Sequence, residues 1–159
     1  MDEIKLLLLL LVANGAPVIA YDIFRQKWAY PIDGGRHLAD GNRLFGDSNT
    51  YRGWISALIS CGITALLLGY SYQIGLIVAA LAMTGDTLSG FVKRRLGHPP
   101  GSKMLGLDQI PESLLPVLGV ANLLQLDITD VVLITMAFFV LVLVLSRILF
   151  KLNLRKRPY

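Results

Sequence analysis

Residues 82–116 read AMTGDTLSGFVKRRLGHPPGSKMLGLDQIPESLLP, and they join two apolar runs of the chain through a short polar loop. An acid, Asp86, lies inside the first apolar run, which ends at a basic cluster at 93–95. A Gly- and Pro-rich loop then leads to a second acid, Asp108. Because a carboxylate within a membrane-length segment is costly, it is a functional-site hypothesis by default. This stretch therefore predicts both a membrane helix and a site at one end of it.

The composition of the whole chain is that of a membrane protein. The 159 residues are 54% hydrophobic, and the mean hydropathy is +0.59, both too high for an ordinary soluble domain. We expect one all-α, polytopic membrane domain over residues 1–159. Cys61 is the single cysteine, so it is expected to be a small core residue without a disulfide. The acidic amino end, Met1 to Glu3, argues against a cleaved signal peptide.

About five transmembrane helices are predicted from the apolar runs. A run of about 20 apolar residues spans the hydrocarbon core of a bilayer, and the runs lie at 4–24, 54–70, 74–92, 110–126 and 131–150. The fourth run is the weakest of them because it contains Pro111, Glu112 and Pro116. The polar loops 25–53 and 93–109 are expected to lie on the cytoplasmic face. Aromatic residues within 25–53 indicate an ordered cap rather than a disordered linker.

The basic residues give the expected orientation in the membrane. The first polar loop holds five of the fifteen Lys and Arg residues, the segment 93–103 holds four, and the carboxyl end holds five. Five spans place all three segments on the same side, which the positive-inside rule assigns to the cytoplasm. We therefore predict a multi-pass protein of the cell membrane with its amino end outside and its carboxyl end in the cytoplasm.

The third predicted span carries a polar stripe. Helical spacing places Asp86, Ser89, Gly90 and Lys93 on one face, with Asp86 about 9 Å below the end of the span. In this arrangement the carboxylate suits a metal ion held deeper in the membrane, and the ammonium suits a phosphate held nearer the membrane surface. The alternatives are a buried Asp86 that is hydrogen-bonded to its neighbours or paired with an arginine and, for the basic cluster at 93–95, an anchor on anionic lipid.

Other polar residues have two interpretations each. Asn14, near Gly15 and Pro17, marks either a helix kink or a residue that lines a cavity. Asp108 is either a helix cap or a ligand-binding residue. Glu112 follows it by four residues and can face the same way, while Pro116 leaves the Glu112 carbonyl open to a ligand or merely kinks the helix.

Common catalytic motifs are absent from the sequence. It contains no Walker A, GxGxxG, HExxH or CxxC pattern, and nothing in it suggests nucleic-acid binding. The remaining chemistry is phosphoryl or nucleotidyl transfer, in which positioning and charge neutralisation carry most of the catalysis.

Three segments resemble the CDP-archaeol synthase family, which is related to the CDP-diacylglycerol synthases. They are PIDGGRHLADGNRLFGDSNTYRG (31–53), GDTLSGFVKRRLG (85–97) and LDQ (107–109). The resemblance covers nearly the whole chain in length and number of spans. It implies an enzyme that transfers a cytidylyl group from CTP to a membrane lipid phosphate, with Mg²⁺, giving a CDP-lipid and pyrophosphate.

The resemblance also implies the roles of individual residues. Asp86 and Asp108 hold the metal, and with Lys93 they form the catalytic group. Lys93 and Arg94 face the triphosphate. Further substrate-binding residues are Asp40, Gly41, Asn42, Arg43, Thr50, Arg52 and Ser89. The partners are CTP and a lipid phosphate, and a homodimer is a further possibility. Two departures, Asn49 where Lys is common and IPES after LDQ, leave open whether the acceptor resembles 2,3-di-O-geranylgeranylglyceryl phosphate or phosphatidic acid.

Two other functions compete with this one. A CDP-alcohol phosphatidyltransferase would need a DGxxAR pattern, but Asn42 and Arg43 follow Asp40-Gly41. A small transporter or channel would use Asp86 as its intramembrane charge, and such proteins often have polar residues in several spans. The second and fifth spans here are almost wholly apolar.

Overall fold

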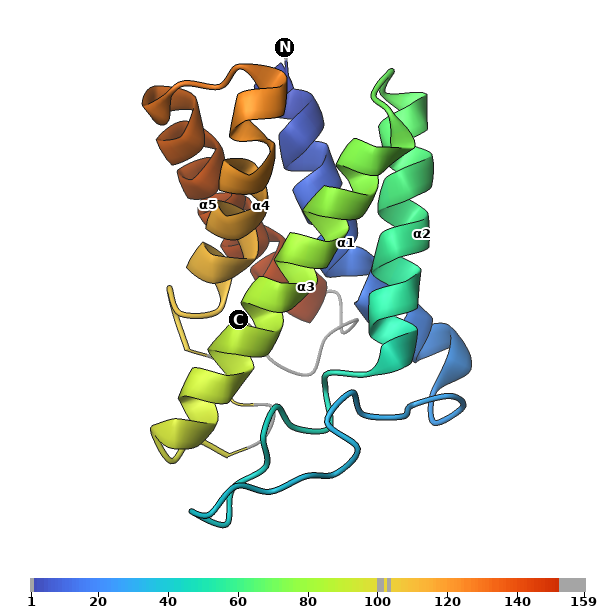
Figure 1. The fold of residues 1–159 in the computed structure, drawn as a ribbon, viewed down its shortest axis with the longest axis vertical. Coiled ribbons are helices and arrows are strands. Elements are labelled where there is room, and N and C mark those ends of the chain that lie inside the picture. Colours follow the sequence, from blue (N-terminus) through green and yellow to red (C-terminus); the bar gives the residue numbers. More distant parts are fainter. Residues whose placement is uncertain (1, 100–101, 103, 152–159) are drawn as a thin grey trace.

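The fold is a bundle of five helices, seen in a computed structural model that describes residues 2–99, 102 and 104–151. The helices are α1 (Asp2–Phe24), α2 (Tyr51–Leu67), α3 (Tyr72–Arg95), α4 (Gln109–Leu124) and α5 (Ile128–Lys151). Figure 1 shows the polar loop between α1 and α2 at the same end of the bundle as the end of α3. The short α2–α3 and α4–α5 connections lie at the opposite end, beside the amino terminus.

The helices differ in how well they fit a membrane. Within the described residues, α1, α3 and Ile128–Ile148 of α5 are long and apolar enough to span one, and α2 is a shorter apolar helix. The fourth predicted span forms α4, which has only 16 residues and contains Pro116. The expected all-α membrane fold is confirmed, while the membrane boundaries of the five helices remain a prediction.

Two glycines allow α3 to pack closely against its neighbours. A Cβ on Gly75 would lie 2.3 Å from the Cys61 carbonyl oxygen of α2, and a Cβ on Gly85 would lie 2.4 Å from the Pro111 carbonyl oxygen of α4. Small residues commonly allow such backbone contact between membrane helices. Cys61 is fully buried in the core, as expected. The crossing at Gly85 is the one that shapes the functional site.

The loop 25–50 is organised around a buried acid, Asp33. Its carboxylate accepts hydrogen bonds from the amides of Gly35, Phe45 and Gly46 and from the guanidinium of Arg43, whose Nη2 is 2.8 Å away. Burial raises the pKa of Asp33, but the Arg43 bond and the three amide bonds outweigh it, so the pKa lies below its ordinary value. The Asp33 carboxylate therefore joins several turns of the loop, which backbone bridges between Pro31 and Thr50 and between His37 and Arg43 also connect.

We expect Asp33→Asn to loosen this loop. Asparagine lacks the negative charge to which Arg43 and the buried amides donate. The loss lowers the stability of the loop by roughly 1–3 kcal/mol. Because the folded pKa is lowered, the stabilisation by Asp33 is complete above about pH 4 and is lost as the pH falls towards the folded pKa. Amide hydrogen exchange across 33–46 should accelerate in the variant at pH 7. Unchanged exchange would contradict a central role for Asp33, and Asp22→Asn on the exposed surface of α1 is the control.

Candidate functional site

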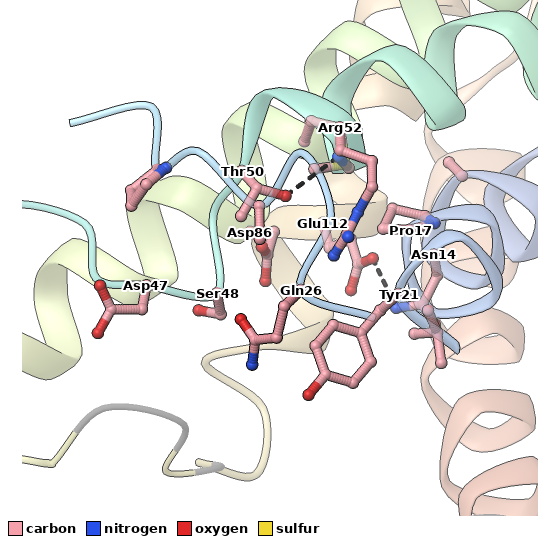
Figure 2. Close-up of a pocket in the computed structure, with 16 residues that line it drawn as sticks. Asn14, Pro17, Tyr21, Gln26, Asp47, Ser48, Thr50, Arg52, Asp86 and Glu112 are labelled. Carbon is pink, nitrogen blue, oxygen red and sulfur yellow. Dashed lines mark hydrogen bonds between the residues drawn. The ribbon is translucent and has the colours of Figure 1, made fainter. Parts of the chain in front are cut away.

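A cavity of about 730 Å³ opens where the first loop meets the helices. Its walls come from α1, α3, α4, the first turn of α2 and the loop between α1 and α2 (Figure 2). The polar residues that line it are Asn14, Tyr21, Gln26, Asp47, Ser48, Thr50, Arg52, Asp86 and Glu112. Its volume lies within the range of pockets that bind small ligands.

Two carboxylates reach the cavity from different helices. Asp86 comes from α3 and Glu112 from α4, and both line the cavity (Figure 2). The Asn14 amide donates a hydrogen bond of 2.6 Å to Glu112 Oε1. Of the two interpretations of Asn14, the structure therefore supports the residue that lines a cavity.

The third acid of the site, Asp108, is paired with a lysine. Lys93 Nζ lies 2.6 Å from Asp108 Oδ1 and donates a hydrogen bond to the Ser102 carbonyl. Asp86 interacts electrostatically with both Lys93 and Asp108. Asp108 does not cap α4 through its side chain; it accepts a hydrogen bond from the amide of Met104 instead. Of the three predicted catalytic residues, Asp86 lines the cavity, whereas Lys93 and Asp108 form an ion pair with each other outside its lining.

A divalent metal ion fits these carboxylates. The described residues contain no cluster of three His, Cys, Asp or Glu side chains that could hold a metal alone. Magnesium commonly uses one or two carboxylates together with substrate phosphates. Asp108 Oδ1 is buried and accepts no well-oriented hydrogen bond, although the Lys93 ammonium contacts it. Asp86 and Asp108 therefore provide oxygen atoms that a metal shared with a polyphosphate can use.

Two buried arginines in the described part of the chain have no carboxylate bound to them. Arg94 is only 4% exposed; its Nη1 donates to the His98 carbonyl, while its Nε has no partner. Arg52 lines the cavity and donates to the carbonyls of Arg25 and Lys27. Its Nε also lacks a partner. Arg52 also lies over the ring of Tyr21, 5.6 Å from its centroid. Buried cations without a carboxylate partner favour an anionic ligand.

Several predicted substrate-binding residues do not line the cavity. Arg95 forms an ion pair with Asp40, which also accepts hydrogen bonds from Asn42. Arg43 binds Asp33 and Asp47. Gly41 lies in the same turn, at a φ of 76°. The segment 40–43 thus builds the loop beside the end of α3.

The remaining predicted residues have structural contacts of their own. Ser89 is buried and donates to the Asp86 carbonyl within α3. Gly90 lies under the loop, where an added Cβ would be 3.3 Å from the Phe45 carbonyl oxygen. Thr50 lines the cavity and also caps α2 by accepting a hydrogen bond from the Gly53 amide.

The sequence reasoning missed other residues of the cavity, among them Tyr21, Gln26 and Ser48. Tyr21 follows Asn14 by seven residues, so both lie on one face of α1. That spacing was a usable signal for Tyr21. Gln26 and Ser48 lie in the loop, where no periodicity points to a cavity.

Comparisons with known proteins identify the family of the chain. The family model described as CarS-like, CDP-archaeol synthase, matches residues 3–75 and 69–159. The chain belongs to this family. A CDP-archaeol synthase of Pyrobaculum calidifontis is 34% identical over the full length of both chains. One of Pyrobaculum aerophilum is 40% identical, and one of Thermofilum pendens is 36% identical.

The matched regions differ in extent among these CDP-archaeol synthases. The alignment with the Pyrobaculum aerophilum protein covers 62% of each chain. The alignment with the Thermofilum pendens protein covers 62% of this chain and 51% of that one. A solved structure, described as an intramembrane enzyme for archaeal membrane lipids biosynthesis, matches with a TM-score of 0.72 and 30% identity. That match covers 90% of this chain and 91% of the other.

These findings confirm the predicted family, the helical membrane fold and, at the level of the family, the enzyme class of a CTP-dependent nucleotidyltransferase. Cytidylyltransferases generally use a divalent metal, in keeping with the two acids beside the cavity.

Proposed function

We propose that this protein transfers the cytidylyl group of CTP to a membrane lipid phosphate, giving a CDP-lipid and pyrophosphate in phospholipid biosynthesis. The observation that carries the proposal is one cavity that brings the carboxylates of Asp86 and Glu112 together with the buried guanidinium of Arg52. Carboxylates suit a metal ion, and the guanidinium suits a phosphate. Membership of the CDP-archaeol synthase family supports the same reaction.

The reaction needs no general base from the protein. A phosphate monoester has its second ionisation near pH 6, so a lipid phosphate is already an anionic nucleophile at neutral pH. One of its oxygens forms a bond to the α-phosphorus of CTP. The bond from that phosphorus to the oxygen bridging to the β-phosphate breaks, and pyrophosphate leaves with the electron pair.

The chain's residues position and neutralise these anions. Asp86 and Asp108 would hold Mg²⁺, which when bound polarises the α-phosphate. Lys93 and Arg94 bind the β- and γ-phosphates and stabilise the charge on the departing pyrophosphate. Lys93 is paired with Asp108 in this structure, and it exchanges part of that pairing for phosphate when CTP binds. Arg52 and Thr50, at the amino-terminal end of α2, contact the nucleotide.

The other predicted residues act through the loop. Asp40, Gly41, Asn42 and Arg43 hold the loop against the end of α3, where Arg95 pairs with Asp40. This contact keeps the neighbouring Arg94 in position. Ser89 supports the turn of α3 that carries Asp86 by donating to its carbonyl.

The site is proposed to lie at the cytoplasmic face of the cell membrane, with the amino end outside. Most basic residues lie in the two polar loops and the carboxyl end, and CTP is a cytoplasmic nucleotide. The named relatives are archaeal CDP-archaeol synthases, so the first acceptor to test is 2,3-di-O-geranylgeranylglyceryl phosphate. A homodimer remains a prediction that mass measurement in detergent would test.

Pyrophosphate release by the purified protein in detergent tests the reaction. The assay combines CTP and Mg²⁺ with either the ether-linked archaeal lipid phosphate or phosphatidic acid. We expect release that requires CTP, metal and one lipid together. Absence of both release and CTP binding would reject the proposal and favour a transporter that uses Asp86, which a flux assay in vesicles would detect.

We expect Arg94→Ala to weaken CTP binding about tenfold or more, because the variant removes a buried cation that has no carboxylate partner in the described structure. The measurement is the KM for CTP at saturating lipid. Arg36→Ala, which removes an exposed arginine of the first loop, is the matched control and should leave KM unchanged. Equal KM values for the two variants would show that Arg94 does not bind the phosphates of CTP.

A further inference from the structure

We propose that the turn 24–30, which follows α1, is a membrane-interface anchor. Its aromatic side chains lie among the lipid headgroups, while its other side forms part of the cavity wall. The partner is the lipid surface itself, and the anchor does not depend on which reaction the cavity performs.

The length of α1 places this turn at the edge of the hydrocarbon. The helix has 23 residues, about 34 Å at 1.5 Å per residue, which slightly exceeds the hydrocarbon thickness of about 30 Å. Its first turn carries the acids Asp2 and Glu3, so Phe24 emerges near the opposite boundary. Figure 1 shows this end of α1 at the outer edge of the bundle, beyond α2.

The side chains at this boundary are those of a membrane interface. Trp28 is 62% exposed and Tyr30 is 70% exposed, and the rings of Phe24 and Trp28 lie 5.3 Å apart. An apolar groove of about 290 Å³ between α1 and α2 runs along α1 from Val12 to Phe24, so a surface suited to lipid chains continues directly into the aromatic turn. Trp and Tyr are enriched at headgroup level because each combines an apolar ring with a polar N–H or O–H group.

The charge of the turn suits anionic headgroups. Arg25 and Lys27 are exposed between the aromatic residues, and the sequence has no acid from Arg25 to Ile32; Asp22 lies one turn earlier on α1. Basic residues beside a membrane attract anionic lipids. A two-fold contact with a second copy would bring the same patch against itself, so its positive charges would repel each other. The lipid surface therefore matches the turn better than another copy of the chain.

The backbone of the turn separates a membrane side from a cavity side. Arg25 and Trp28 have φ values of 48° and 56°, in the left-handed region that side chains other than glycine rarely adopt. The buried Arg52 donates to the carbonyls of Arg25 and Lys27, each at 2.7 Å, and so holds this conformation. Gln26 lines the cavity (Figure 2). The anchor thus fixes one wall of the cavity at the membrane surface.

The test is the fluorescence of Trp28 in the full chain, reconstituted in vesicles of phosphatidylcholine and phosphatidylglycerol. Trp54→Phe leaves Trp28 as the single tryptophan and removes no hydrogen bond, because Trp54 Nε1 has no partner in the described structure. We expect a nitroxide on the lipid headgroup to quench Trp28 at least about twofold more than a nitroxide at the end of the lipid chain, and aqueous iodide to quench it weakly.

A tryptophan elsewhere in the same loop is the matched control. Leu38→Trp, combined with Trp28→Phe and Trp54→Phe, places it at an exposed position of the loop. We expect iodide to quench this tryptophan strongly and the lipid nitroxides to quench it weakly. Strong iodide quenching of Trp28 that neither nitroxide reproduces overturns the anchor. Protection from iodide that is lost when the protein is diluted in lipid shows that a second copy covers the patch, and it overturns the anchor as well.

Trypsin gives an independent measurement, because Arg25 and Lys27 are exposed cleavage sites within the turn. In nanodiscs of the same lipids, we expect Trp28→Ser to raise the rate of cleavage after these residues about tenfold, because the ring that holds the turn on the membrane is lost. Leu38→Ser should leave the rate unchanged. Wild-type cleavage as fast as that of Trp28→Ser contradicts the anchor.

Discussion

Asp86→Asn is expected to lower turnover at least a hundredfold while the protein remains folded. The carboxylate lies on α3, lines the cavity and interacts electrostatically with Lys93 and Asp108. Asparagine has nearly the same shape but no charge to hold a metal ion or balance Lys93. Loss of one preorganised electrostatic contact at a reacting centre commonly costs two to three orders of magnitude in rate. Pyrophosphate release at saturating CTP and lipid measures the effect.

Stability separates this functional role from a structural one. An ionised carboxylate in a membrane-embedded helix is costly, so the melting temperature of Asp86→Asn should equal or exceed that of the wild type. A structural Asp86 would give the reverse result, with a lower melting temperature and retained activity. Thr84→Ala is the control, because the Thr84 hydroxyl donates to the Ala80 carbonyl within α3 and does not line the cavity.

Gly85→Val is expected to destabilise the protein and to abolish activity. Its Cβ would lie 2.4 Å from the carbonyl oxygen of Pro111, a backbone atom that cannot move without separating α3 from α4. Overpacking of a tight core typically costs about 1–3 kcal/mol of stability, and we expect the cost of Gly85→Val to lie at or above the upper end of this range. Separation of the two helices also moves Asp86 away from Glu112. Thermal unfolding in detergent and pyrophosphate release measure the two effects.

Two other glycines serve as comparisons for Gly85→Val. A Cβ at Gly62 would lie 3.8 Å from its nearest neighbour, Leu76, so Gly62→Ala should change neither stability nor activity. Gly75 contacts the Cys61 carbonyl away from the cavity, so Gly75→Ala should lower stability while the surviving folded protein keeps its KM. If Gly85→Val behaved like Gly62→Ala, the helix crossing would not shape the site.

Local sequence patterns predicted the helices and the residues that share a helix face, because hydropathy and helical periodicity depend on residues that are close in the sequence. Apolar runs gave the five helices within a few residues of their observed bounds. Helical periodicity predicts that Asp86 and Lys93 share one face, and both residues lie on α3 in the structure. The first loop was less predictable. Arg43 is predicted to bind substrate, and in the structure it pairs with the buried Asp33 and the exposed Asp47, two contacts that no periodicity in the loop indicates.

Hydropathy and the 3.6-residue repeat act within each segment, so they were sufficient to predict a helical membrane protein with an acid and a basic cluster at one helix end. Which residues share the cavity depends instead on how distant segments pack together. Asn14 of α1 and Glu112 of α4 are 98 positions apart, and they meet because the two helices pack in one bundle, in which Gly85 lets α3 and α4 touch. The rotation of each helix about its axis depends on such contacts between distant segments, and no local pattern encodes it.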